Sequence, residues 1–172
     1  MPTTGTVVVG ADGSPASRNA IAFALHDAAR RGACVRVIAA AETPESAMGL
    51  YGIPPVPSPQ ALAENALQAA RREVDGVLRA NTDVAAVPVT VEATVGAPAR
   101  VLVDASDGAD MLVLGHRGRG AVASAVLGSV GLHCLLYATC PVTIVRPTTA
   151  DEAIDDAPVV ASPERGTPVS AT

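Results

Sequence analysis

Short apolar runs rich in valine, isoleucine and leucine alternate along this chain with longer segments of helical periodicity. Such runs are typical of buried strands, and the segments between them are long enough for crossover helices. Strands that alternate with helices form parallel sheets, so the sequence predicts an α/β fold with an open parallel sheet. The five predicted strands are Thr6–Gly10, Cys34–Ala40, Val87–Val95, Met111–Leu114 and Val142–Val145.

Helix boundaries carry their own signals. Ser14-Pro15 and Ser58-Pro59 each place a capping hydroxyl before a proline at the first helical position. Gly32 follows two arginines and predicts a left-handed exit from the first helix. Two shorter helices are expected to begin near Pro98 and Ser129. The buried stripe of the second helix is predicted to be Leu62, Ala66, Ala70, Val74 and Val77.

Two strands differ in a way that predicts their places in the sheet. Val87–Val95 alternates apolar residues with Thr90, Glu92 and Thr94, so one of its faces is polar and it belongs at an edge. Met111–Leu114 is continuously apolar, which favours a central position.

Two segments lie outside this regular pattern. Glu42–Pro57 is rich in proline and glycine and is expected to be a long loop. Residues 148–172 carry five acidic residues against one arginine and show little periodicity, which predicts a disordered acidic tail. Residues 1–147 are then expected to form one domain.

Composition excludes several functions. Aromatic residues make up 2% of the chain and the net charge is −5, so neither base-stacking platforms nor an electrostatic nucleic-acid surface is expected. All twelve basic residues are arginines, which excludes a Walker A lysine and Schiff-base chemistry. The three cysteines have no disulfide or zinc spacing. No signal peptide or membrane span is predicted, because Asp12 interrupts the first apolar run and glycines with Pro141 interrupt the last. We therefore expect a cytoplasmic protein with no membrane association.

The candidate chemistry lies where two strands end. Parallel sheets bind ligands beyond the carboxyl ends of their strands, at the point where the strand order reverses. The segments that leave the first and fourth strands are Gly10–Ser14 (GADGS) and Gly115–Gly120 (GHRGRG), and they would meet at that crevice. Glycines let backbone amides surround an anion, and the helix that begins after Gly128 adds free amides. Glycine-rich loops also serve tight turns only, so phosphate binding remains one of two readings of this segment.

The charged residues near this crevice have two readings each. Asp12 either accepts hydrogen bonds from a ligand or caps the first helix. Arg117 and Arg119 either add positive charge to an anion site or are solvated surface residues. Small residues at Ala39–Ala41 would leave room for a base.

The spacing Gly115-x2-Gly118-x9-Gly128-Ser129 resembles the ATP-binding branch of the universal stress protein family. The segments VVVGADGSPAS, VGAPARVLVDAS and CPVTIVRP are also similar to that family, and the resemblance covers about residues 5–147. It implies strand order 3-2-1-4-5 with helices on both faces of the sheet, and ATP in the crevice. It also implies a homodimer paired through Val142–Val145, which has no charged residue to protect an exposed edge.

Carried over by position, the resemblance places Gly10 and Asp12 beside the adenosine and residues 115–121 around the phosphates, with Gly128 and Ser129 in contact with phosphate or ribose. No catalytic residue or metal ligand is assigned, and whether Mg2+ accompanies ATP stays open. The candidate site residues are Gly10, Ala11, Asp12, Ala40, Gly115, His116, Arg117, Gly118, Arg119, Gly120, Ala121, Gly128, Ser129 and Val130.

Three functions are compatible with these observations. The leading hypothesis is a regulatory stress-response protein that binds ATP and an unknown protein partner, with at most slow hydrolysis, because no general base and no lysine are visible. The others are a dimeric interaction module without nucleotide and a related α/β nucleotide-processing enzyme. Flavodoxin chemistry is disfavoured because aromatic residues to surround a flavin are scarce and the first strand is not followed by a Thr/Ser-rich phosphate loop.

Overall fold

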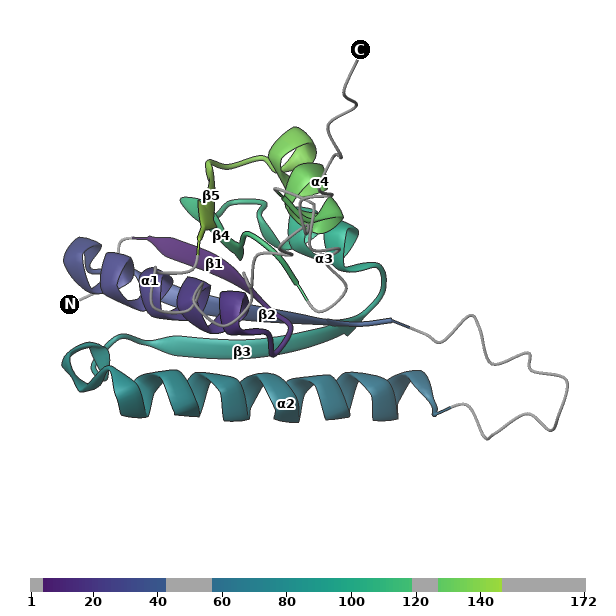
Figure 1. Cartoon of the computed structure of the whole chain (residues 1–172), viewed down its shortest axis with the longest axis horizontal. Helices are drawn as coiled ribbons and strands as arrows, with labels where there is room; N and C mark the ends of the chain where they lie inside the picture. The colour runs from purple at the N-terminus through teal and green to yellow at the C-terminus, as the bar shows by residue number, and fades with distance from the viewer. Residues whose placement is uncertain (1–4, 43–56, 119–126, 147–172) are drawn as a thin grey trace, which may run out of the picture.

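The computed structural model describes residues 5–42, 57–118 and 127–146. These residues form one five-stranded sheet of order β3-β2-β1-β4-β5 in which every neighbouring pair is parallel (Figure 1). The α/β fold, the strand order and helices on both faces are confirmed. The strands are β1 (Thr6–Ala11), β2 (Cys34–Ala41), β3 (Val89–Val95), β4 (Met111–Gly115) and β5 (Val142–Val145); the helices are α1 (Pro15–Arg31), α2 (Pro59–Ala80), α3 (Pro98–Ala105) and α4 (Ser129–Tyr137), with a 3-10 turn at Thr82–Val84.

The predicted caps explain where the long helices begin. The Ser14 hydroxyl accepts a hydrogen bond from the Ser17 amide at 3.1 Å, and the Ser58 hydroxyl accepts one from the Ala61 amide at 3.2 Å. Gly32 ends α1 with a φ of 67°, a left-handed conformation that a side chain would strain.

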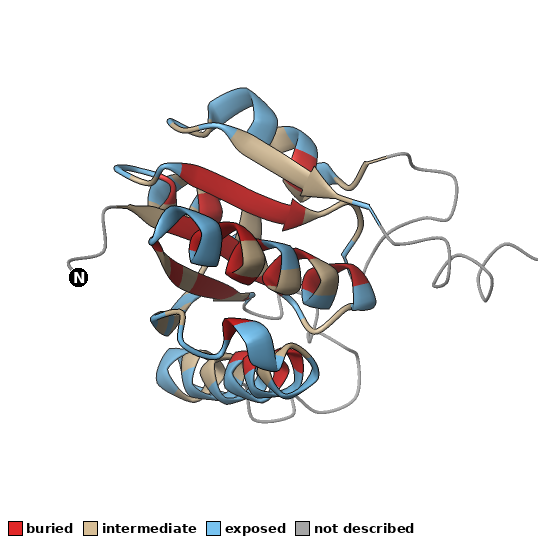
Figure 2. Cartoon of the chain, turned by 90° about the vertical axis from the view of Figure 1, so that its left-hand side faces the viewer, coloured by how far each residue is buried: buried red, intermediate tan, exposed pale blue. Residues whose placement is uncertain are grey.

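Burial follows the strand order. β3 lies at one edge and alternates half-buried with exposed residues, as its polar face predicted. β1 and the first four residues of β4 are largely buried, and β4 lies between β1 and the edge strand β5 (Figure 2). β3 begins at Val89 instead of Val87, because the Val87 amide is bonded back to the Val84 carbonyl and Pro88 has no N–H to donate.

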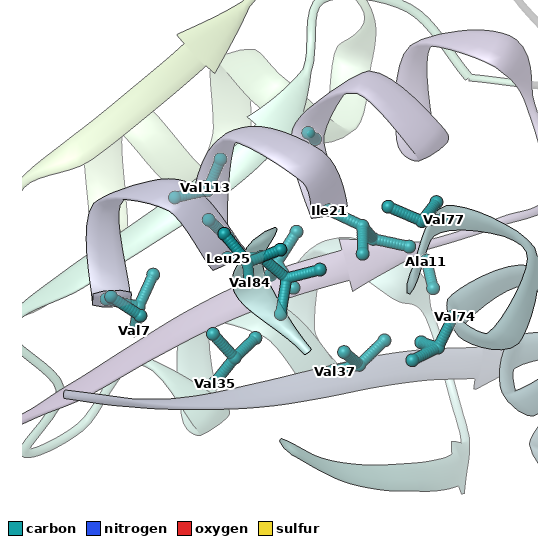
Figure 3. Packing of buried hydrophobic residues seen from close by; sticks show 14 of the residues in the cluster. Val7, Ala11, Ile21, Leu25, Val35, Val37, Val74, Val77, Val84 and Val113 are labelled. Carbon is teal, nitrogen blue, oxygen red and sulfur yellow. The ribbon is translucent and has the colours of Figure 1, made fainter. Parts of the chain in front are cut away.

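The face of the sheet under α1 and α2 holds the larger hydrophobic core. Figure 3 shows Ile21 and Leu25 of α1 between the valines of the strands and Val74 and Val77 of α2. Ile21 and Leu25 are fully buried. This core anchors both helices that flank the exit of β1.

The opposite face is covered by α3 and α4, which contact each other. Its smaller core gathers around Leu102 of α3, Leu112 and Leu114 of β4 and Cys134 of α4. Burial raises the pKa of the Cys134 thiol to about 11, so this cysteine is an inert, apolar packing group at neutral pH.

Two sequence expectations lie outside what the structure describes: most of the loop Glu42–Pro57 and the whole tail 148–172. Within residues 5–42, 57–118 and 127–146, no helix is long and apolar enough to cross a bilayer.

Candidate functional site

A cavity of about 660 Å³ lies at the carboxyl ends of the strands. Its walls come from the turn between β1 and α1, the end of β2, the inner side of α2, part of α3, the exit of β4 and the first turn of α4. The crevice expected between the first and fourth strands therefore exists. The residues that line it are Gly10, Ala11, Asp12, Gly13, Ser17, Ile38, Ala39, Ala40, Ala41, Glu42, Leu62, Ala66, Ala69, Ala70, Glu73, Pro98, Leu102, Leu114, Gly115, Arg117, Gly118, Ser129, Val130 and Gly131.

The turn after β1 holds Asp12 in a fixed position. Its backbone amide donates to the Ser17 hydroxyl at 3.2 Å, and its Oδ1 accepts a hydrogen bond from the Ser14 amide at 2.9 Å. Ser14 is the N-cap of α1, so Asp12 does not serve as that cap. The Asp12 carboxylate is thus oriented by the turn while Asp12 lines the cavity.

The exit of β4 packs directly on this turn. A Cβ atom at Gly115 would lie 2.7 Å from the carbonyl carbon and oxygen of Ala16 in α1. A Cβ atom at Gly118 would lie 2.6 Å from Oδ2 of Asp12. Both approaches are closer than real Cβ contacts. At Gly115 the obstacle is the backbone of α1, so this position needs glycine for steric reasons, whereas a side chain at Gly118 would have to displace the Asp12 carboxylate. The two glycine-rich segments singled out in the sequence are therefore neighbours in space.

The backbone of His116 brings the start of α4 to the same place. Its amide donates to the Val145 carbonyl at 2.9 Å, and its carbonyl accepts from the Gly128 amide at 3.1 Å. Gly128 is the N-cap of α4 and makes no side-chain capping bond. The first amides of a helix have no intrahelical partner, so the α4 N-terminus presents donors beside the turn that follows β4.

The structure thus brings most of the predicted site residues together. His116 and Gly128 do not line the cavity and act through their backbone contacts. Arg119, Gly120 and Ala121 lie outside the described residues. The predicted residues that line the cavity are Gly10, Ala11, Asp12, Ala40, Gly115, Arg117, Gly118, Ser129 and Val130.

Sequence analysis missed two charged residues of the wall, Glu42 and Glu73. Glu73 of α2 is only 9% exposed. Its Oε2 accepts a hydrogen bond from the Gly13 amide at 3.0 Å. Burial raises the pKa of the Glu73 carboxyl and the charge of Asp12 raises it further, while the Ser17 hydroxyl and the Gly13 amide oppose the change. Helical spacing offered a signal, because Glu73 follows Leu62, Ala66 and Ala69 or Ala70 on one side of α2.

The charges of the described wall are mostly negative. Asp12, Glu42 and Glu73 line the cavity, and Arg117 is the one basic residue among its described lining residues. Across the described ranges, no group of three or more His, Cys, Asp or Glu side chains is arranged to hold a metal ion.

Comparison with known proteins identifies relatives of the whole domain. The model of the universal stress protein family matches residues 3–146. Universal stress proteins Rv1996 and Rv2005c of Mycobacterium tuberculosis are 31% and 33% identical over 174 and 178 residues, in each case 95% of this chain and 55% of the relative. The chain spans about half the length of these curated relatives.

Solved structures agree with the observed topology. The crystal structure of a universal stress protein in complex with cAMP is 28% identical with a TM-score of 0.62, covering 84% of this chain and 98% of the other. Universal stress protein UspA from Lactobacillus plantarum, 20% identical, superposes with a TM-score of 0.61 over 85% of this chain and 100% of the other, which supports the fold. The match of the family model over nearly the whole described chain leads to one conclusion: the chain belongs to the universal stress protein family.

Proposed function

We propose that this domain binds ATP in the cavity at the carboxyl edge of its sheet and acts in a stress response through nucleotide-dependent conformation or partner binding. The single observation that carries the proposal is the contact between the β4 exit at Gly118 and the Asp12 carboxylate in one shared cavity. A cytoplasmic location belongs to the same proposal.

The phosphates are assigned to the β4 side. Gly115 and Gly118 bring the backbone close to the cavity, and the first residues of α4, from Ser129 onward, line the same space. Backbone amides and the helix dipole stabilise anions without a lysine. Arg117 supplies a positive side chain there.

The nucleoside is assigned to the β2 and α2 side. Ala39, Ala40 and Ala41 leave space at the end of β2, and Leu62 and Ala66 of α2 provide apolar surface opposite. A flat base fits such a slot, while Asp12 accepts a hydrogen bond from the sugar or the base. The related structure that contains cAMP supports an adenine nucleotide as the ligand class.

Hydrolysis is proposed to be slow at most. The chain has no lysine to neutralise the transferred phosphoryl group, and no described residue is positioned as a base toward an attacking water. A Mg2+ ion that enters with ATP would find Asp12 as its carboxylate ligand next to the Gly118 turn, where it would neutralise phosphate charge.

A homodimer paired through β5 is part of the proposal. β5 is a sheet edge and its four residues are half-buried. The Pro141 carbonyl accepts a hydrogen bond from Leu112 of β4, and the Val145 carbonyl accepts one from His116, the residue after β4. Alternation therefore directs the backbone groups of Val142 and Ile144 outward. A second copy would satisfy those groups.

Calorimetric titration of the full chain with ATP tests the function. Asp12→Ala should weaken binding by roughly tenfold or more, because a charged hydrogen bond is lost. Asp75→Ala is the matched control, since Asp75 is exposed on α2 and outside the cavity. No saturable binding by the wild type would overturn the proposal and favour a nucleotide-free dimeric interaction module.

A further inference from the structure

A shallow groove lies between α1 and α2, beside the proposed nucleotide cavity. It has a volume of about 400 Å³. Its lining residues are Gly13, Arg18, Ala69, Arg72, Glu73 and Gly76. Gly13, Ala69 and Glu73 also line the nucleotide cavity, so the two spaces share a border. The function proposed above uses neither arginine of this groove.

Two arginine side chains give the groove a positive charge. Arg18 and Arg72 are exposed, and neither forms an ion pair with a carboxylate in the described part of the chain. The Arg18 guanidinium donates a hydrogen bond to the Gly13 carbonyl at 3.2 Å, which holds it beside the groove. Glu73, the acidic residue among the described lining residues, is buried, and its Oε2 accepts the Gly13 amide. The groove therefore favours an acidic occupant.

The α2 side of the groove is small and uncovered. Ala69, Arg72 and Gly76 follow one another at spacings of three and four residues, so they lie along one side of the helix. Ala69 is exposed, and a Cβ atom at Gly76 would meet no atom within 4 Å. A glycine inside a helix is less stable than alanine, and no described neighbour requires one here. The surface of Ala69 and Gly76 thus leaves room for an aliphatic side chain of the occupant.

The chain itself contains a segment with the matching pattern. Residues 151–156 read DEAIDD, in which two pairs of carboxylates flank Ala153 and Ile154. This acidic segment holds four of the five acidic residues beyond position 147, where Arg165 is the one basic residue. Carboxylates pair well with guanidinium groups, and an isoleucine side chain gains free energy when it covers apolar surface.

The described chain ends on the side of the molecule where the groove begins. Arg146 follows β5 at the carboxyl edge of the sheet, and Val145 packs against the core under α1 and α2. Arg18 is in the first turn of α1, which starts from the same edge. The acidic segment therefore does not have to cross the sheet to reach the groove.

The length of the connection is sufficient. β5 lies three strands from β2, which is about 14 Å at the usual strand spacing. The path must also pass around α1, a helix about 10–12 Å across. An extended chain covers about 3.3–3.6 Å per residue, so residues 151–156 reach up to about 17–35 Å from Arg146. A tethered segment also has a high effective concentration, which favours weak charged contacts.

We infer that the acidic segment, residues 151–156, docks in the groove between α1 and α2. Its carboxylates pair with Arg18 and Arg72, and Ile154 covers the small residues of α2. The docking does not depend on the proposed ATP function, although it places the segment at the border of the nucleotide cavity. The docked segment closes a basic surface of the domain to other acidic partners.

Amide NMR of the full chain tests the docking from the side of the segment. In the wild type, the amides of Ala153 and Ile154 should differ from random-coil shifts. In Arg18→Gln/Arg72→Gln they should move to random-coil values, because both guanidinium partners are lost.

The matched control removes the same charge elsewhere. Arg71 and Arg100 are exposed and do not line the groove, so Arg71→Gln/Arg100→Gln should leave both amides at their wild-type positions. Identical shifts of Ala153 and Ile154 in the wild type and in both double variants would overturn the inference.

Neutralising the acidic segment tests the same contact from the side of the groove. The variant carries Asp151→Asn, Glu152→Gln, Asp155→Asn and Asp156→Asn, and it changes no residue of the described fold. The amides of Arg72 and Gly76 should shift, whereas that of Gly32, at the far end of α1, should not. No shift at Arg72 and Gly76 would contradict the docking and leave the groove to a separate acidic partner.

Mixing distinguishes the chain's own segment from that of a second copy. Unlabelled wild type is added to the isotope-labelled neutral variant, and the groove amides of the variant are observed. They should stay at the variant's positions, because the wild-type segment is occupied by its own groove. Movement to the wild-type positions would assign the groove to a second copy and overturn docking within one chain.

Discussion

The two faces of the sheet differ sharply in how well they are covered. Under α1 and α2, buried residues from β1, β2, β4 and both helices form one continuous core. Over the other face, α4 is short and leaves large apolar side chains in solvent. Leu132, Leu135, Leu136 and Tyr137 are 54%, 47%, 67% and 60% exposed.

Because of this difference, we expect one face of the sheet to stabilise the fold and the other to move when a ligand binds. Buried apolar area is the main source of folding free energy, so the α1/α2 face should hold the fold together. α4 is lightly anchored, yet its N-terminus borders the cavity. Elements with few buried contacts move most easily, so a bound nucleotide is expected to shift α4 before it shifts α1 or α2.

The largest effect tests the core directly. Leu25→Ala removes a fully buried side chain of the α1/α2 face and should lower the free energy of unfolding by about 2–5 kcal/mol. Leu136→Ala on α4 removes a mostly exposed leucine and should change it by less than ~0.5 kcal/mol. Urea denaturation of both variants gives the comparison. Equal losses would mean that the α4 face is as well packed as the other.

A proline in β5 tests whether a second copy of the chain pairs with this edge of the sheet. Val142→Pro removes an outward amide that the proposed dimer would use, while Val142→Ala keeps that amide and trims the same side chain. Sedimentation velocity should show monomers for the proline variant and dimers for the wild type and the alanine variant. Unchanged dimers in the proline variant would exclude pairing through β5.

Two glycine substitutions compare a position in the cavity wall with a position outside it. Gly118→Ala forces a Cβ atom against Asp12 Oδ2 and should weaken ATP binding by about tenfold, as expected for a misplaced charged hydrogen bond. Gly76→Ala in α2 meets nothing within 4 Å and should leave ATP binding unchanged. Titration calorimetry distinguishes the two. Equal ATP affinity in both variants would show that the Gly118 turn takes no part in ATP binding.

The smallest expected effect is on the pH dependence of the stability of the fold. Because the pKa of Glu73 is raised in the folded state, the folded protein binds this proton more tightly than the unfolded chain does. The Glu73 contribution to stability should therefore fall as pH rises from the ordinary glutamate value through the raised pKa. Thermal melts of the wild type and Glu73→Gln across that window should show a wild-type loss that the variant lacks. A wild-type contribution that rises with pH would contradict the raised pKa.

Local sequence signals predicted most of the fold. Strand runs, the serine caps and the exit at Gly32 depend on neighbouring residues, and the structure shows them where the pattern placed them. The polar alternation of β3 gave its edge position because one face of an edge strand needs no cover.

The site was predictable only where it is made of strand exits. Gly10–Ser14 and the Gly115 turn could be paired because topology alone brings them together. Glu73 could not be found in this way, since its partner Gly13 is sixty residues away in sequence and a glutamate beside an apolar stripe normally faces solvent. The contacts of His116 with Val145 and Gly128 are likewise tertiary and invisible in local pattern.

The central claim is that the exits of β1 and β4 form one nucleotide pocket, and an ATP titration followed by amide NMR tests it most directly. The amides of Gly13, Gly115 and Gly118 should show the largest shifts, because all three residues line the cavity. Gly32 and Gly108 lie in turns at the amino ends of β2 and β4, at the other edge of the sheet from the cavity. Their amide shifts should stay unchanged. Shifts at Gly32 and Gly108 with none at the three cavity glycines would contradict the account.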